Sequence, residues 1–203
     1  MNQHRDDIAA MKQWLDSAID RGAVPVLTGQ NGDMDTIGSA IALSAIHPAL
    51  LACGIHLGRI AKRMVDDLNA PFRKISSQGA EFPEKLGGII VVDAASPDQV
   101  GINLPDVPKL IIDHHATNGW MLEKGDVLVK WDVSATTEMV ASYLFEHAPE
   151  VLSDSVRKML LAGMITDTGR FRHARTSSFA VTTKLLENSN IDYAEFCEAI
   201  EKE

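Results

Sequence analysis

A set of acidic and imidazole side chains stands out because its members follow apolar runs along the chain: Asp33, Asp35, Asp93, Asp113, His114, His115 and Asp167. Carboxylates crowded together raise one another's pKa, and a bound divalent cation relieves that repulsion. Oxygen and imidazole ligands without thiolate suit manganese or magnesium more than structural zinc. The set therefore predicts a centre for one or two divalent ions.

The spacing within this set indicates what such ions would do. Asp33 and Asp35 are two residues apart, so in an extended loop both carboxylates point the same way. Two metal ions about 3.5–4 Å apart can activate a water molecule and neutralise a phosphoryl group. One Asp after a strand is more often a helix cap or a turn residue. The ordered set of motifs is what favours metal-assisted chemistry on a phosphate ester.

Strands that end side by side are needed to bring these groups together. Short apolar runs predict strands at 24–28, 50–55, 88–92, 109–112 and 127–131. Helical spacing predicts helices around 8–19 and at 36–46, 57–68, 136–146, 153–166, 177–187 and 193–200. This alternation is typical of an α/β three-layer domain, with a mainly parallel sheet flanked by helices on both faces. Ligands bind at the carboxyl ends of such strands.

Size and charge restrict the class of protein. We expect residues 1–203 to form a single domain, with 45% apolar residues available for its core. A net charge of −9 argues against binding to long DNA, but not against a small phosphorylated substrate. Cys53 and Cys197 form no metal-binding pair, the N-terminus is polar, and no apolar run could span a membrane. We expect a cytoplasmic protein that acts without a membrane, and its oligomeric state stays open.

Three stretches of this sequence resemble the DHH phosphoesterase superfamily. They are Asp113-His114-His115-Ala116-Thr117-Asn118, Ser134-Ala135-Thr136-Thr137-Glu138-Met139 and Asp167-Thr168-Gly169-Arg170-Phe171. The superfamily includes RecJ nucleases, family II pyrophosphatases, exopolyphosphatases and nanoRNase/phosphoadenosine-phosphate phosphatases. The last of these branches is the one that the motifs resemble most.

The resemblance implies a division of the metal ligands between two ions. Asp93 would bridge both ions, and Asp33 would bind the first. Asp35, His114 and Asp167 would complete the second, with manganese or magnesium as the metal.

The resemblance also implies roles outside the metal shell. His115 would contact the scissile phosphate or assist the leaving group, and Asp113 would orient a histidine. The cationic residues just after Asp167 are candidates for substrate phosphate contacts, although such a stretch can also be a solvated loop. These candidates are Arg170, Arg172 and His173.

The sequence departs from the superfamily pattern in two places. The first motif normally reads His-x-x-x-Asp-x-Asp, and Gly29 occupies the histidine position. The neighbouring Gln30 is a poor substitute, so we expect the second metal site to fill and the first to be weak or empty. The chain also stops where other members carry a second, substrate-gripping lobe, and residues 190–203 would form the connecting helix towards it.

These observations favour one function and leave two others open. The first is a divalent-metal-dependent phosphoesterase acting on a small nucleotide or a short oligonucleotide. The second is a catalytically weak or silent DHH module that binds a nucleotide or a protein partner, which the loss of the motif histidine favours. The third is a pyrophosphatase-like hydrolase.

Overall fold

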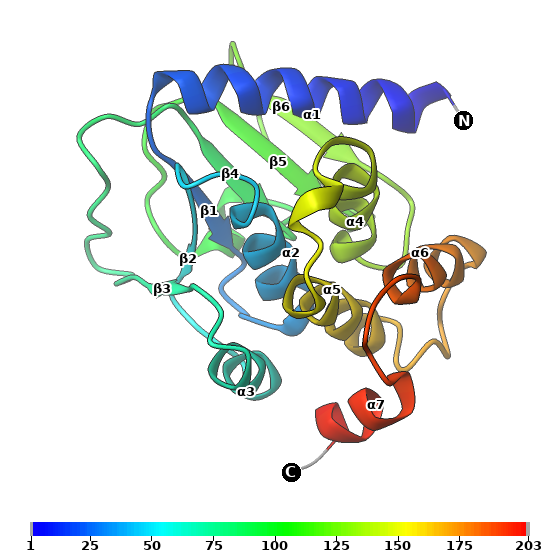
Figure 1. The fold of residues 1–203 in the computed structure, drawn as a ribbon. Helices are drawn as coiled ribbons and strands as arrows, with labels where there is room; N and C mark the ends of the chain where they lie inside the picture. The colour runs from blue at the N-terminus through cyan, green and yellow to red at the C-terminus, as the bar shows by residue number, and fades with distance from the viewer. Residues whose placement is uncertain (1, 202–203) are drawn as a thin grey trace.

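The computed structural model describes residues 2–201, and its centre is a six-stranded sheet of order β3-β2-β1-β4-β5-β6 (Figure 1). The strands are β1 (Val24–Thr28), β2 (Leu50–Gly54), β3 (Arg73–Lys74), β4 (Ile89–Val92), β5 (Lys109–Asp113) and β6 (Val127–Lys130). All of their pairings within these residues are parallel. The sequence prediction of an α/β fold with a mainly parallel sheet is therefore confirmed.

Helices precede the sheet, connect its strands and follow it. They are α1 (Asn2–Arg21), α2 (Met34–Ser44), α3 (Arg59–Asp67), α4 (Thr136–His147), α5 (Asp154–Asp167), α6 (Thr176–Leu186) and α7 (Tyr193–Glu201), with short 3₁₀ helices η1 (Pro97–Val100) and η2 (Pro149–Val151). Apart from α1, which is longer than expected, the predicted helices and strands lie within two residues of their observed bounds. The two-residue strand β3 and both 3₁₀ helices were not predicted, because they are too short to show a periodic pattern.

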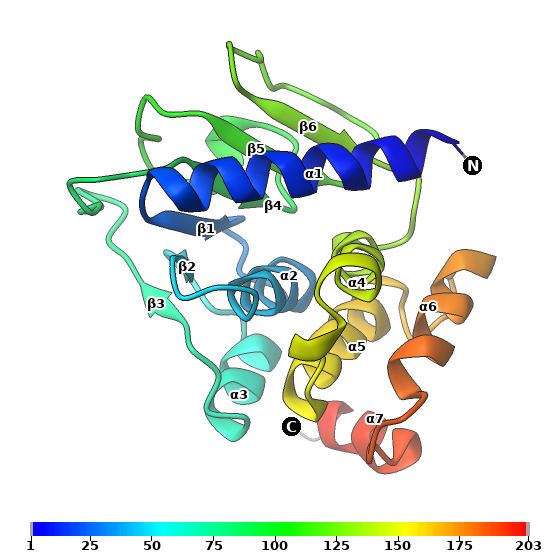
Figure 2. The ribbon, with the colours of Figure 1, turned by 45° about the horizontal axis from the view of Figure 1, so that its top comes forward.

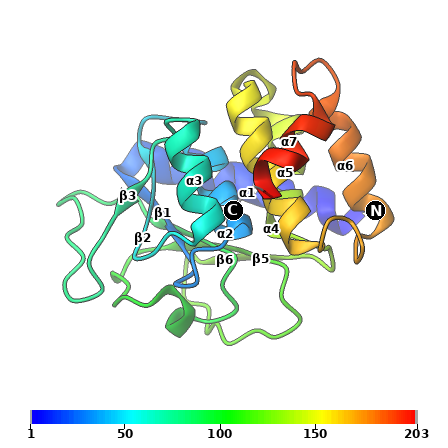
Figure 3. The same cartoon turned by 90° about the horizontal axis from the view of Figure 1, so that it is seen from below.

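Different structures cover the two faces of the sheet (Figures 2 and 3). One face, which includes Val26 and Ile90, packs in the main core with apolar residues of all seven α-helices. The other face, which includes Leu27 and Val91, packs with Trp120 and with residues of η1 and the connecting loops. This differs from the expectation of helices on both faces. A strand buried on both faces has the same apolar pattern whichever structure covers it, so the sequence could not distinguish the two arrangements.

Helix α2 is buried along nearly its whole length between the sheet and α5. Glycine makes this close approach possible. A Cβ on Gly38 would lie 2.6 Å from the carbonyl oxygen of Met159 in α5, and one on Gly163 would lie 2.5 Å from Cγ2 of Thr137 in α4. The glycines therefore let α2, α4 and α5 meet closely beside the carboxyl end of the sheet.

The register of the central strands aligns the residues that follow them. Thr28 pairs with Val92, and Val92 pairs with Ile112. Asp93 and Asp113 therefore leave the sheet at the same level. The order of strands reverses between β1 and β4, and such a switch point at the carboxyl edge of an open sheet is where ligands bind.

The C-terminal end of the described chain is helical. Helix α7 lies within the range 190–203 for which a connecting helix was predicted, and residues 202–203 lie outside the described part. Its role as a connection to a second lobe stays a prediction. Within residues 2–201, no helix combines the length and the apolar character that crossing a membrane requires.

Candidate metal centre

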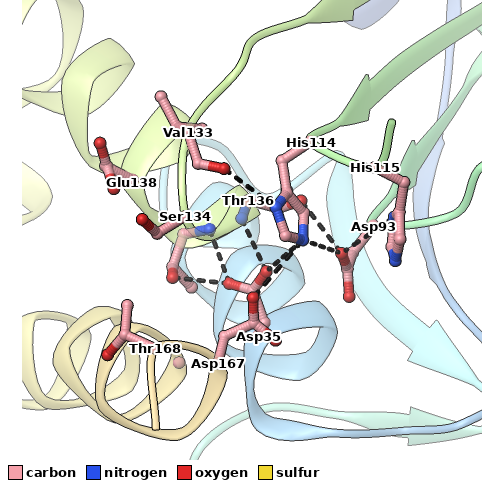
Figure 4. A network of polar contacts seen from close by, with 12 residues as sticks. Asp35, Asp93, His114, His115, Val133, Ser134, Thr136, Glu138, Asp167 and Thr168 are labelled. Atoms are coloured by element: carbon pink, nitrogen blue, oxygen red, sulfur yellow. Dashed lines mark hydrogen bonds and ion pairs between the residues drawn. The ribbon is translucent and has the colours of Figure 1, made fainter. Parts of the chain in front are cut away.

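Four elements deliver acidic and imidazole groups to one place at the carboxyl edge of the sheet (Figure 4). Asp35 lies in the first turn of α2, and Asp93 directly follows β4. His114 directly follows β5, and Asp167 is the last residue of α5. Residues from the first and last thirds of the chain therefore meet at a single centre.

The Nε2 atom of His114 is the middle of this arrangement. It lies 3.5 Å from Oδ1 of Asp93, 3.8 Å from Oδ2 of Asp35 and 3.5 Å from Oδ2 of Asp167. The other ring nitrogen, Nδ1, lies 3.3 Å from the carbonyl oxygen of Val133. A proton on Nδ1 that is donated to this carbonyl leaves the lone pair of Nε2 directed at the three carboxylates, which is the tautomer that a metal ligand needs.

Two sets of described side chains bring their ligand atoms within 4.8 Å of one another and could each hold an ion. One set is Asp35, His114 and Asp167, and the other is Asp93, His114 and His115. The four ligands that the superfamily resemblance implies for the second metal are all contained in these overlapping sets. Imidazole nitrogen and carboxylate oxygen without thiolate form a donor set that fits a divalent cation of the manganese or magnesium type.

Burial and mutual repulsion explain why such a centre would attract a cation. Burial, followed by the charges of Asp93 and Asp167, raises the pKa of Asp35 well above its ordinary value. Burial raises the pKa of Asp167 to about 6, with the nearby carboxylates adding to the effect. Burial lowers the pKa of His114, but the contact with Asp93 and the surrounding carboxylates outweigh it and raise the pKa to about 9. These groups hold protons where a metal ion could replace them.

The N-terminus of α4 holds the carboxylate of Asp35. Oδ2 of Asp35 accepts the backbone N–H of Thr136 at 2.6 Å, and Oδ1 accepts the N–H and the hydroxyl of Thr137 at 2.8 and 2.6 Å. The hydroxyl of Thr136 also donates to Oδ1 of Asp93 at 3.1 Å. Thr136 and Thr137 therefore orient two of the carboxylates, a role that our sequence analysis did not assign to them.

The prediction that the two aspartates of the first motif share an extended loop is wrong. Asp33 is the N-cap of α2, and its Oδ1 accepts the N–H of Thr36 at 3.1 Å. Asp35 is already helical, so its side chain leaves in another direction. Asp35 is buried in the group around His114, whereas Asp33 belongs to neither of the two ligand sets.

Asp93 has an unusual backbone conformation. Its φ is +57°, in the left-handed region that favours glycine. Its N–H remains bonded to the carbonyl oxygen of Ile112 at 2.9 Å, which continues the sheet pairing by one residue. Strained residues of this kind persist where the surrounding structure holds them, and they cluster at functional sites.

His115 and Asp113 form a second pair at the same edge. Nδ1 of His115 lies 2.6 Å from Oδ1 of Asp113 and 3.8 Å from Oδ1 of Asp93. Asp113 is buried, whereas 41% of the His115 side chain is exposed. A buried carboxylate thus orients an imidazole that remains accessible to a ligand from solvent.

The structure places the cationic candidates in the turn after α5. Gly169, Arg170 and Phe171 all have positive φ, and the side chains of Arg170, Arg172 and His173 are exposed. The ring of His173 lies against Gly169, with Cδ2 3.3 Å from the position that a Cβ would take there. These exposed residues follow Asp167 closely in the chain, and their contact with a substrate stays a prediction.

Comparison with known proteins supports the reading of these motifs. Residues 23–164 match the model of the DHH family, N-terminal domain. The uncharacterized protein MJ0988 of Methanocaldococcus jannaschii is 25% identical over 174 residues, which are 83% of this chain and 52% of that protein. The chain thus spans about half the length of this curated relative.

Two solved structures share the fold. One is a Methanococcus jannaschii protein assigned by inference as a family II inorganic pyrophosphatase, with a TM-score of 0.71 and 22% identity over 87% of this chain and 60% of that one. The other is an exopolyphosphatase-related protein from Bacteroides fragilis, with a TM-score of 0.72 and 16% identity over 97% of this chain and 60% of that one. Identities this low show a common fold. Because the family model covers well over half of the sequence and the motif residues meet at one centre, the chain belongs to the DHH family.

Proposed function

We propose that this chain is a divalent-metal-dependent phosphoesterase. The observation that carries the proposal is the position of His114 Nε2, which faces carboxylate oxygens of three aspartates from three elements at 3.5–3.8 Å. A purely structural role does not require three carboxylates that repel one another to gather around one imidazole. Membership of the DHH family supports the same conclusion.

Each group has a specific task in this proposal. Asp35, Asp93, His114 and Asp167 would hold manganese or magnesium, which would supply an activated water and neutralise phosphoryl charge. His115 is accessible and held by Asp113, so it contacts the scissile phosphate or protonates the leaving group.

The substrate that we propose is a small nucleotide or a short oligonucleotide. A net charge of −9 disfavours long nucleic acid, which binds through many cationic contacts. The residues after the two histidines, Ala116-Thr117-Asn118, resemble the nucleotide-handling branch. We assign contacts with further phosphates to Arg170, Arg172 and His173, because they are cationic, exposed and close to Asp167 in the chain.

Two alternative functions have specific observations in their favour. The solved structures described as pyrophosphatase and exopolyphosphatase-related favour cleavage of a phosphoanhydride, although at these identities they support the fold alone. The glycine at position 29, where the first motif of the superfamily has a histidine, favours a silent module. The intact group around His114 supports the enzyme over the silent module.

A substrate panel tests the proposal. The purified chain with manganese is assayed against a dinucleotide, a 3′,5′-bisphosphorylated nucleotide, inorganic pyrophosphate and inorganic polyphosphate. We expect hydrolysis of the first two, loss of at least 10²-fold in Asp93→Asn and His114→Ala, and no change in Asp20→Ala and His56→Ala, whose side chains are exposed. Hydrolysis of the phosphoanhydrides alone would replace our substrate class. Absence of metal-stimulated activity on all four would favour the silent module.

A further inference from the structure

The turn that replaces the motif histidine is closed and rigidly placed. The N–H of Gly32 donates to the carbonyl oxygen of Gly29 at 3.1 Å, and Gly32 has a φ of +60°. A Cβ on Gly32 would lie 2.4 Å from the carbonyl oxygen of His56, so only glycine fits there. This turn fixes its two central residues, Gln30 and Asn31.

Those two residues point to different places. The N–H of Gln30 donates to the carbonyl oxygen of Gln99 at 2.7 Å, and its side chain lies beside Gly101, away from Gly29. Nδ2 of Asn31 instead donates to Oδ2 of Asp33 at 2.6 Å. Asn31, not Gln30, therefore reaches the acidic residues.

The amide of Asn31 lies where a side chain on residue 29 would begin. A Cβ on Gly29 would be 3.0 Å from Oδ1 of Asn31 and 3.1 Å from the carbonyl oxygen of Asp93. A histidine at position 29 and the Asn31 amide in its present place would thus compete for the same space. With glycine at position 29, this space is open to the amide of Asn31, whose NH₂ group faces the carboxylate of Asp33.

We propose that Asn31 supplies the ligand that Gly29 lacks, its amide oxygen binding the first metal together with Asp33 and Asp93. This inference rests on the proposed metal-dependent function. In the structure the NH₂ group of the amide donates to the Asp33 carboxylate. The terminal torsion of asparagine is broad and roughly two-fold, so rotation exchanges nitrogen and oxygen at little cost when a cation arrives.

An amide oxygen changes what the first site binds. Asn31, Asp33 and Asp93 form an all-oxygen set, which suits hard cations such as magnesium and manganese. The second site keeps the imidazole of His114 and binds softer divalent ions more strongly. The first site is therefore the weaker one for manganese, and it rejects zinc more strongly than the second.

Calorimetric titration of the full chain with manganese chloride tests this assignment. We expect two binding events in the wild type, and in Asn31→Ala a weaker second event by about 10-fold or more, since even loss of a residue that only orients a ligand costs 10–100-fold. Asn31→Asp, which keeps an oxygen ligand, should retain both events. Gln30→Ala is the matched control from the same turn and should match the wild type. Because Asn31 is exposed, its replacement should leave the melting temperature of the metal-free chain unchanged.

The outcomes separate this inference from the function on which it rests. Equal second-site affinity in Asn31→Ala and wild type would overturn the role of Asn31. A single manganese event in the wild type would also overturn it, while leaving the centre around His114 intact. Failure of the wild type to bind manganese at all would overturn the proposed function itself.

Discussion

The backbone N–H and the hydroxyl of Thr137 both donate to Oδ1 of Asp35, at 2.8 and 2.6 Å. This contact joins the first turns of α4 and α2, and it stabilises the ionised form of a buried carboxylate. Thr137→Val keeps the volume of the side chain but removes the hydroxyl. We expect it to lower manganese affinity by about 10–100-fold, as measured by calorimetric titration.

Thr137→Ser is the matched control because it keeps the donor. It should retain the affinity of the wild type. Equal manganese affinity in Thr137→Val and wild type would show that Thr137 does not prepare Asp35 for the metal.

The raised pKa values predict how pH affects the metal-free chain. His114 has a pKa of about 9 in the folded chain and about 6.5 when unfolded, so it binds its proton more tightly on folding. Its contribution to stability is fully present below pH 6.5 and is lost as the pH rises to about 9. The pKa of Asp167 is also raised on folding, to about 6. Its contribution to stability is therefore present below a pH of about 4 and is lost as the pH rises from about 4 to about 6.

Thermal unfolding in the presence of a chelator checks this sign. The Tm of the wild type should fall between pH 6.5 and 9, and the fall should be shallower in His114→Asn. Manganese should raise the Tm more at pH 8 than at pH 6.5, because it competes with fewer protons. His56→Ala is the control and should keep the slope of the wild type. Equal slopes in His114→Asn and wild type would contradict the assigned pKa.

Asp113 and His115 make a prediction about turnover. Oδ1 of Asp113 lies 2.6 Å from Nδ1 of His115, and Asp113 itself belongs to neither of the two ligand sets that share His114. Asp113→Asn should lower kcat by about 10–100-fold and leave the tighter manganese event unchanged. A loss of manganese binding that accounts for the whole loss of kcat would place Asp113 in metal binding instead.

Neighbouring residues of α2 give a prediction about stability. A Cβ on Gly38 would lie 2.6 Å from backbone oxygen of Met159, so Gly38→Ala should lower the free energy of unfolding by about 1–3 kcal/mol through overpacking. Ser39 is also buried, and its hydroxyl has no hydrogen-bond partner among the described residues. Ser39→Ala should therefore be neutral or stabilising in the same urea titration. A neutral Gly38→Ala would show that α2 and α5 can separate at little cost.

Much of the centre could be predicted because strand ends are visible in a sequence. Asp93 and His114 each follow a compact apolar run, and parallel strands place such positions at one edge. The position of Asp167 was harder to predict, because this residue ends a helix rather than a strand. Its position depends on the close contact of α2 with α5, which the chain order does not reveal.

The residues that orient the ligands could not be predicted in the same way. Thr137 lies 102 residues from Asp35 and is neutral, so neither charge nor spacing marks the contact. Asp33 was placed in an extended loop because its capping role depends on where α2 begins, and helix boundaries are the least certain part of sequence reasoning. The sequence did not mark Asn31 as a candidate ligand, because the closeness of its amide to the position of a Cβ on residue 29 is visible only in the structure.

The most direct test of the metal centre is a crystal structure of this chain grown with manganese, with anomalous scattering used to locate the metal. We predict a strong peak about 2.0–2.4 Å from His114 Nε2 and from carboxylate oxygens of Asp35, Asp93 and Asp167. A second, weaker peak should lie beside Asp33. Ordered side chains around His114 with no manganese peak within bonding distance of Nε2 would contradict the account.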